Sequence, residues 1–117
     1  MKAWLPVIAA LLLLVAAGGC ASNALSAAPV KTNHVEMPPS YKFSPEVIEV
    51  RAGTTVTWHN SDNFTHSVKL LPDGKALVAA PGQTVQITFD KPGVYDYTCS
   101  FHPHDMQGKV IVVAGTP

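Results

Sequence analysis

The segment from Cys99 to Met106 concentrates side chains that bind metal ions. It contains one cysteine, two histidines and one methionine within eight residues, CSFHPHDM. Thiolate, imidazole and thioether groups are soft or borderline ligands, which suit copper better than the oxygen-seeking ions Ca²⁺ and Mg²⁺. The segment lies between two strand-like runs, so we interpret it as a loop held at both ends. Its composition predicts a copper site with donors among Cys99, His102, His104 and Met106.

A further donor is available from His66, far upstream in the chain. In the run 64–71 this histidine has the same alternation parity as Phe64 and Val68. It therefore faces the interior if the run is a half-buried strand. An imidazole among apolar side chains needs a polar partner or a metal ion. Alone, His66 is more simply explained as a hydrogen-bonded core histidine, but beside the Cys99–Met106 segment it is favoured as a ligand.

Cys99 has no evident disulfide partner. The only other cysteine is Cys20, which follows an apolar segment typical of export signals. In an oxidising compartment a single thiol is a liability unless it is buried, catalytic or bound to metal. A buried, inert cysteine is the simpler alternative, and the nearby histidines favour a metal ligand instead.

The rest of the body predicts short β-strands. Apolar and polar residues alternate over 54–59, 84–89 and 94–99, and no run after residue 20 keeps a helical apolar period. Ten prolines and eight glycines divide the chain into turns. We therefore expect an all-β Greek-key sandwich or barrel of about seven to eight strands.

With these features together, the sequence resembles the cupredoxins, small type 1 (blue) copper proteins of the plastocyanin and amicyanin kind. The resemblance covers Phe43 to Val113, through FSPEVIEVRAGTTVTWHNSDNFTHSV, PGVYDYTCSFHPHDM and GKVIVV. It implies one copper ion held by His66, Cys99 and His102, with Met106 as axial ligand. The three residues between His102 and Met106 give a loop intermediate between the longer plastocyanin-like and shorter amicyanin-like loops.

This ligand set favours electron transfer over catalysis. Two histidines and a cysteine with a weak axial methionine match the blue-copper arrangement. Four protein donors leave no open position for a substrate, so we expect a carrier that serves redox partner proteins and not an enzyme. The resemblance further implies that the backbone N–H groups of Ser67 and Phe101 donate to the Cys99 sulfur, and that His102 is the electron port.

Some alternatives at the loop stay open. His104 is either a solvated side chain, a replacement for His102, or a transient ligand during copper loading. Several apolar residues form either a docking patch or simply a stiff loop: Phe101, Pro103, Pro72 and Pro81.

Other function classes are weighed against the electron carrier. A protein for copper delivery or resistance would use the same ligands, and exchangeable ones such as His104 would suit it. A zinc site in an interaction module leaves Met106 unexplained. A copper oxidase or nitrite reductase needs a second metal centre, which five histidines do not supply. We expect no small-molecule substrate.

The length and charge of the chain limit the number of domains and the kinds of partner that we expect. The chain has 117 residues, enough for one domain, which we place at 34–117. Eight basic and eight acidic residues give a formal net charge of zero. Because nucleic-acid-binding domains usually carry a basic excess, we expect no nucleic-acid partner.

The N-terminus predicts export and a lipid anchor. Residues 1–19 combine Lys2, an apolar run and small residues, as in a secretory signal peptide. Cys20 then resembles the lipidated cysteine of bacterial lipoproteins, and residues 20–33 are expected to form a flexible tether. This predicts a lipoprotein on the periplasmic face of a membrane. The alternatives are a soluble periplasmic protein, cleaved after Ala21 or Ala28, or an uncleaved anchor helix.

Overall fold

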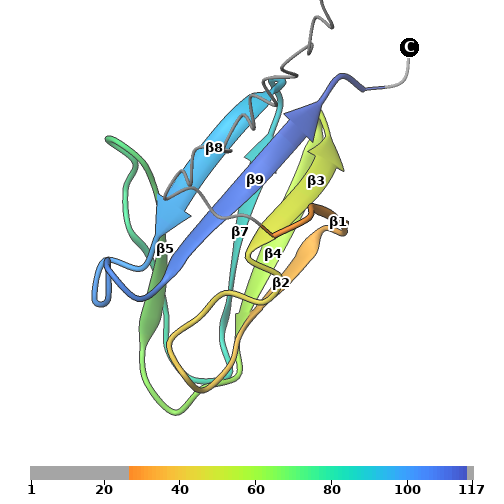
Figure 1. Cartoon of the computed structure of the whole chain (residues 1–117). Helices are drawn as coiled ribbons and strands as arrows, with labels where there is room; N and C mark the ends of the chain where they lie inside the picture. Colours follow the sequence, from red (N-terminus) through yellow and green to blue (C-terminus); the bar gives the residue numbers. More distant parts are fainter. Residues whose placement is uncertain (1–26, 116–117) are drawn as a thin grey trace, which may run out of the picture.

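The structure is a computed structural model and describes residues 27–115 of the chain. The predicted signal peptide, Cys20 and the first half of the predicted tether, up to residue 26, lie outside the described residues. Within 27–115 the chain forms nine β-strands and no helix, arranged in two sheets that pack face to face (Figure 1). In this part of the chain, no helix has the length and hydropathy required to span a membrane.

The larger sheet contains His66 in one strand and holds both ends of the loop that carries the other candidate ligands. In spatial order its strands are β1 (Val30–Lys31), β3 (Val47–Arg51), β9 (Gln107–Val113), β8 (Gly93–Thr98), β5 (His66–Leu70) and β6 (Leu77–Ala79). The pairs β1–β3 and β3–β9 are parallel, and the other pairs are antiparallel. Because Lys69 pairs with Thr98, the strand that begins at His66 lies beside the strand that leads to Cys99.

The smaller sheet closes the other side of the core. It contains β2 (His34–Met37), β4 (Thr54–Asn60) and β7 (Thr84–Phe89), with β2 parallel and β7 antiparallel to β4. The alternation in β4 sends Val56 and Trp58 inward, and both are fully buried. The loops that follow β2, β4 and β8 meet at one end of the sandwich, and β3 and β9 end at the opposite end (Figure 1).

Aromatic rings fill the core between the sheets. Tyr97 contacts Phe43 and Trp58 edge to face, with ring centroids 4.7 and 5.3 Å apart. Gly108 lies opposite Tyr97 in the β8–β9 pair, and a Cβ atom there would overlap the Tyr97 ring. The absence of a side chain at Gly108 therefore leaves the space that the end of the Tyr97 ring occupies.

The predicted all-β fold is confirmed, with nine strands where seven to eight were expected. One addition is β1, which pairs in parallel with Ile48 and Glu49 of β3. The last residues of the segment 20–33, predicted as a tether, thus join the sheet. A two-residue strand shows no side-chain alternation, because backbone hydrogen bonds with its neighbour define it.

The run 64–71 is also shorter as a strand than its alternation suggests. Strand β5 begins at His66, and Phe64 lies in the preceding turn with its side chain 58% exposed. The expectation that Phe64 faces inward is therefore wrong, whereas His66 and Val68 are fully buried as predicted.

Candidate metal centre

Three donor atoms converge where the loops meet. The Cys99 Sγ lies 3.9 Å from the Nδ1 of His66 and 3.9 Å from the Nδ1 of His102. All three atoms lie within 4.8 Å of one another. Two donors bound to one ion, each at about 2.0–2.3 Å, are themselves about 3.6–3.8 Å apart for angles near those of trigonal or tetrahedral sites. The observed spacing therefore fits a single shared metal ion.

The Cys99 sulfur is enclosed and oriented by β5. It is fully buried and accepts a hydrogen bond from the Ser67 backbone N–H at 3.4 Å. The Ser67 hydroxyl lies 3.8 Å from the same sulfur and contacts the Ser100 hydroxyl at 2.7 Å. Within residues 27–115 the Phe101 N–H makes no such bond to the sulfur. The described structure thus contains the Ser67 contact and lacks the one expected from Phe101.

The outer nitrogen of His66 is held by a carboxylate. His66 Nε2 lies 2.9 Å from Asp62 Oδ2, and both side chains are buried. This hydrogen bond holds the pKa of Asp62 below its ordinary value. A carboxylate on the outer nitrogen of a ligating histidine fixes its tautomer and orientation. Asp62 was not among the residues predicted for the site, although its Asp-x-x-x-His spacing before a strand was a visible signal.

Asn60 organises the turn that places Asp62. Its buried side-chain amide donates to the carbonyl groups of Phe64 and Ala79 at 2.7 and 2.9 Å. Its Oδ1 accepts the Asp62 N–H at 2.9 Å. The carboxylate is therefore held by a turn that Asn60 fixes through three hydrogen bonds, which restricts its movement relative to His66.

The loop after β8 is closed on itself by hydrogen bonds. The Met106 carbonyl accepts the Thr98 hydroxyl at 2.8 Å and the Cys99 N–H at 3.2 Å. The Met106 N–H donates to the His102 carbonyl at 3.0 Å. Met106 is fully buried beside Cys99 in the apolar core cluster. Its role as axial ligand stays a prediction.

Comparisons with known proteins agree with this geometry. The family model described as a cupredoxin-like domain matches residues 7–112. The chain belongs to the cupredoxin-like family. Amicyanin-alpha of Methylorubrum extorquens is 36% identical over 113 residues, covering 89% of this chain and 93% of that protein. A plastocyanin of Scenedesmus fuscus is 33% identical over 85 residues, covering 60% and 85%.

Solved structures show the same fold. A purple cupredoxin from Nitrosopumilus maritimus superposes with a TM-score of 0.60 at 31% identity, covering 68% of this chain and 98% of that one. A copper-containing nitrite reductase from Thermus scotoductus gives a TM-score of 0.62 at 31% identity, but this chain spans only 25% of that enzyme. The predicted cofactor, one type 1 copper ion, is confirmed by family membership and by the His–Cys–His set.

The two loop histidines of this cupredoxin differ in position. His102 belongs to the converging group and is half-buried. His104 is exposed and is not part of that group. The geometry therefore favours His102 over His104 as the loop donor.

Aromatic side chains surround the mouth of the site. Phe64 and Phe101 are 58% and 53% exposed, and Tyr41 is 39% exposed. The Tyr41 ring centroid lies 4.5 Å from that of His102 and 6.1 Å from that of Phe64. Phe101 was considered for a docking patch from the sequence, whereas Tyr41 was not predicted and Phe64 was expected in the core. No local signal identifies Tyr41, because its contacts join segments that are far apart in the chain.

A carboxylate held between two histidines lies away from the copper ligands. His34 and His59 flank Glu36 on the smaller sheet, at 2.6 and 2.9 Å. Partial burial raises the pKa of Glu36, but hydrogen bonds from His34, His59 and Ser61 outweigh this and bring it below 4.5.

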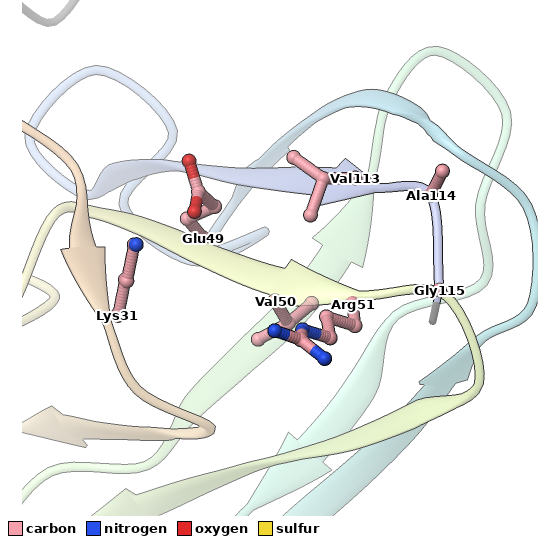
Figure 2. Close-up of a pocket in the computed structure, with 7 residues that line it drawn as sticks. All are labelled: Lys31, Glu49, Val50, Arg51, Val113, Ala114 and Gly115. Atoms are coloured by element: carbon pink, nitrogen blue, oxygen red, sulfur yellow. The ribbon is translucent and has the colours of Figure 1, made fainter. Parts of the chain in front are cut away.

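A shallow groove lies at the opposite end of the sandwich, where β3 and β9 terminate (Figure 2). It contains no histidine or cysteine, so it does not form a second soft-metal site. Its lining residues are Lys31, Glu49, Val50, Arg51, Val113, Ala114 and Gly115.

Proposed function

We propose that this cupredoxin carries single electrons between redox partner proteins through one type 1 copper site. The observation that carries the proposal is the enclosed Cys99 sulfur, flanked at 3.9 Å by the inner nitrogens of two histidines. The family membership and the amicyanin and plastocyanin relatives support it.

The residues of the chain keep the ligand geometry constant. Copper, when bound, supplies the one-electron couple between Cu(I) and Cu(II). Asp62 holds the His66 ring, and the Ser67 N–H holds the Cys99 sulfur in place. Because both groups are buried and hydrogen-bonded, they move little when the charge at the site changes. Little movement means a low reorganisation cost, which an electron carrier requires.

The partner surface lies around His102. This histidine is the converging donor that reaches toward solvent, since His66 and Cys99 are fully buried. The exposed rings of Phe64 and Phe101 give its surroundings an apolar character. Apolar surface of this kind suits brief contact with another protein, where release must be fast. This supports Phe101 as part of a docking patch, with Phe64 in addition.

Copper titration of the full-length chain, purified in detergent, tests the function. Addition of Cu(II) should give an intense thiolate-to-copper absorption that disappears in Cys99→Ser. His102→Ala should lose the colour and His104→Ala should keep it. Loss of colour only in His104→Ala would overturn the assignment of the loop ligand. Tight, colourless Cu(I) binding with slow electron exchange would instead favour copper delivery.

We also propose that the protein is exported and anchored on the periplasmic face of a membrane by a lipid on Cys20. The pattern of residues 1–19 and the position of Cys20 support this. Cells grown with radiolabelled palmitate should label the wild-type chain and not Cys20→Ala. Equal labelling of both, or of neither, would contradict the anchor.

A further inference from the structure

The connection between β2 and β3 has an unusual backbone next to the metal centre. Ser40 and Tyr41 have φ angles of 90° and 53°, in the left-handed region that residues other than glycine rarely adopt. The base of the connection is pinned by reciprocal hydrogen bonds of 2.8 Å between Glu36 and Ser44. Such a conformation costs free energy and persists where surrounding contacts compensate for it.

Those contacts are aromatic and lie on the metal ligands. The Tyr41 ring meets the His102 ring at 4.5 Å between centroids, with the planes tilted by 55°. It meets the His66 ring edge to face at 6.2 Å. Phe64 stacks on it at 6.1 Å, and Phe43, two residues along the chain, is buried in the core. Tyr41 thus touches the rings of both histidine donors from the solvent side.

His102 has little else to hold its ring. His66 is fixed through its Nε2 by Asp62, but within residues 27–115 the Nε2 of His102 has no hydrogen-bond partner. Its orientation must therefore come from packing. The Tyr41 ring has the closest ring centroid to His102 among the aromatic contacts.

We propose that Tyr41 is the positioning residue for His102 and the cover over the solvent side of the site. This rests on the proposed copper function, because it assigns Tyr41 a role toward the copper ligands. Its ring orients the His102 ring, as the Asp62 carboxylate orients the His66 ring. The strained turn is retained because it presents the Tyr41 ring at this position.

The test compares ring removal with ring retention. Tyr41→Gly removes the ring and suits the left-handed φ angle, so it relieves strain and should fold. Tyr41→Phe keeps the ring and removes only a hydroxyl. Val94→Ala truncates another exposed apolar side chain, on β8 near the opposite end of the sandwich, and serves as the matched control.

Two rates report on the cover. In the metal-free full-length chain, the alkylation of Cys99 by iodoacetamide is followed by mass spectrometry of its peptide, which separates it from Cys20. In the copper-loaded chain, the transfer of Cu(I) to a chelator is followed optically. Both rates should rise about three- to tenfold in Tyr41→Gly, the factor that one aromatic contact supplies. They should stay within about twofold in Tyr41→Phe and Val94→Ala.

Thermal unfolding separates positioning from a purely structural role. A structural role predicts that Tyr41→Gly changes the melting temperature and leaves both rates unchanged, which would overturn the proposal. An equal rise in Tyr41→Phe would also overturn it, because the ring would then not be the active element. If the chain binds no copper, the proposed function fails, whereas the Cys99 alkylation rate still tests the cover.

Discussion

The two histidines of the metal centre are held in different ways. His66 begins a strand, is fully buried, and is oriented by a hydrogen bond from its outer nitrogen to Asp62. His102 lies on a loop, is half-buried, and packs against the Tyr41 ring. A hydrogen bond in the core fixes direction, whereas ring packing at the surface excludes water and still leaves an edge accessible. The difference suggests that one ligand gives the site rigidity and the other gives it access.

The largest effect should come from removing each histidine in turn. Both His66→Ala and His102→Ala should lose the copper colour, because each removes a donor. Only His66→Ala leaves a buried cavity, so its metal-free form should lose about 2 kcal/mol or more of unfolding free energy. His102→Ala should lose less than about 1 kcal/mol. Urea denaturation of the metal-free variants measures both.

Equal destabilisation by the two substitutions would break the comparison. It would mean that His102 is as deeply integrated into the fold as His66. His104 is an exposed histidine of the same loop, so His104→Ala is the control and should leave the free energy of unfolding unchanged.

The next effect should come from the carboxylate behind His66. Asp62→Ala removes the partner of the His66 Nε2, so the ring is less well oriented and less basic. Copper affinity should fall about 10- to 100-fold, the usual cost of losing such a partner. Competition with a chelator of known affinity measures it, and Asp105→Ala, an exposed carboxylate of the loop, is the control. Unchanged affinity in Asp62→Ala would show that packing alone orients His66.

A smaller effect is expected at the Cys99 sulfur. Ser67→Ala removes the hydroxyl 3.8 Å from the sulfur and leaves the N–H at 3.4 Å. Donors to the thiolate stabilise the reduced site, so the reduction potential should fall. A weak hydrogen bond worth about 0.5 kcal/mol corresponds to about 20 mV for one electron. Voltammetry of the loaded protein measures the shift, and a rise in potential would contradict this role for the hydroxyl.

The smallest effect should come from Glu36, the carboxylate held between His34 and His59 on the smaller sheet. Because the pKa of Glu36 is lowered in the folded state, its contribution to stability is present above its ordinary value of 4.5 and is lost as the pH falls through the lowered value. Glu36→Gln should therefore reduce the melting temperature at pH 6, and this deficit should disappear at an acidic pH where the carboxylate is protonated in the folded state.

The Glu36 effect stays small because the groups are partly exposed and solvent screens their charges, so we expect a loss of less than about 1 kcal/mol. Thermal unfolding at the two pH values measures it. A deficit that persists unchanged at the lower pH would show that the ionised carboxylate is not the cause.

Much of the fold was predictable because its signals are local. Alternation in 54–59 and 84–89 repeats every two residues, which matches the geometry of a strand with one buried face. The core positions of Val56 and Trp58 follow directly from it. Strand β1 was not predictable, because two residues carry no period and its pairing depends on where β3 lies.

The metal centre was likewise predictable only in part. The donor types and the inward direction of His66 could be inferred from spacing and parity. The N–H contact of Ser67 to the Cys99 sulfur was expected from the family resemblance, and the structure contains it. Asp62 was not predicted for the site, because its spacing from His66 does not by itself show that the carboxylate meets the outer nitrogen of the ring.

Taken alone, the chain determined which atoms are able to bind copper and which faces of its strands are apolar, because side-chain chemistry and alternation are properties of short segments. Only the tertiary structure decided how each ligand is held. Tyr41 acts through contacts made when loops from separate strands meet at one end of the sandwich, and Asp62 acts through a turn whose shape depends on the hydrogen bonds of Asn60. Such contacts depend on distances in space, which the order of residues along the chain does not contain.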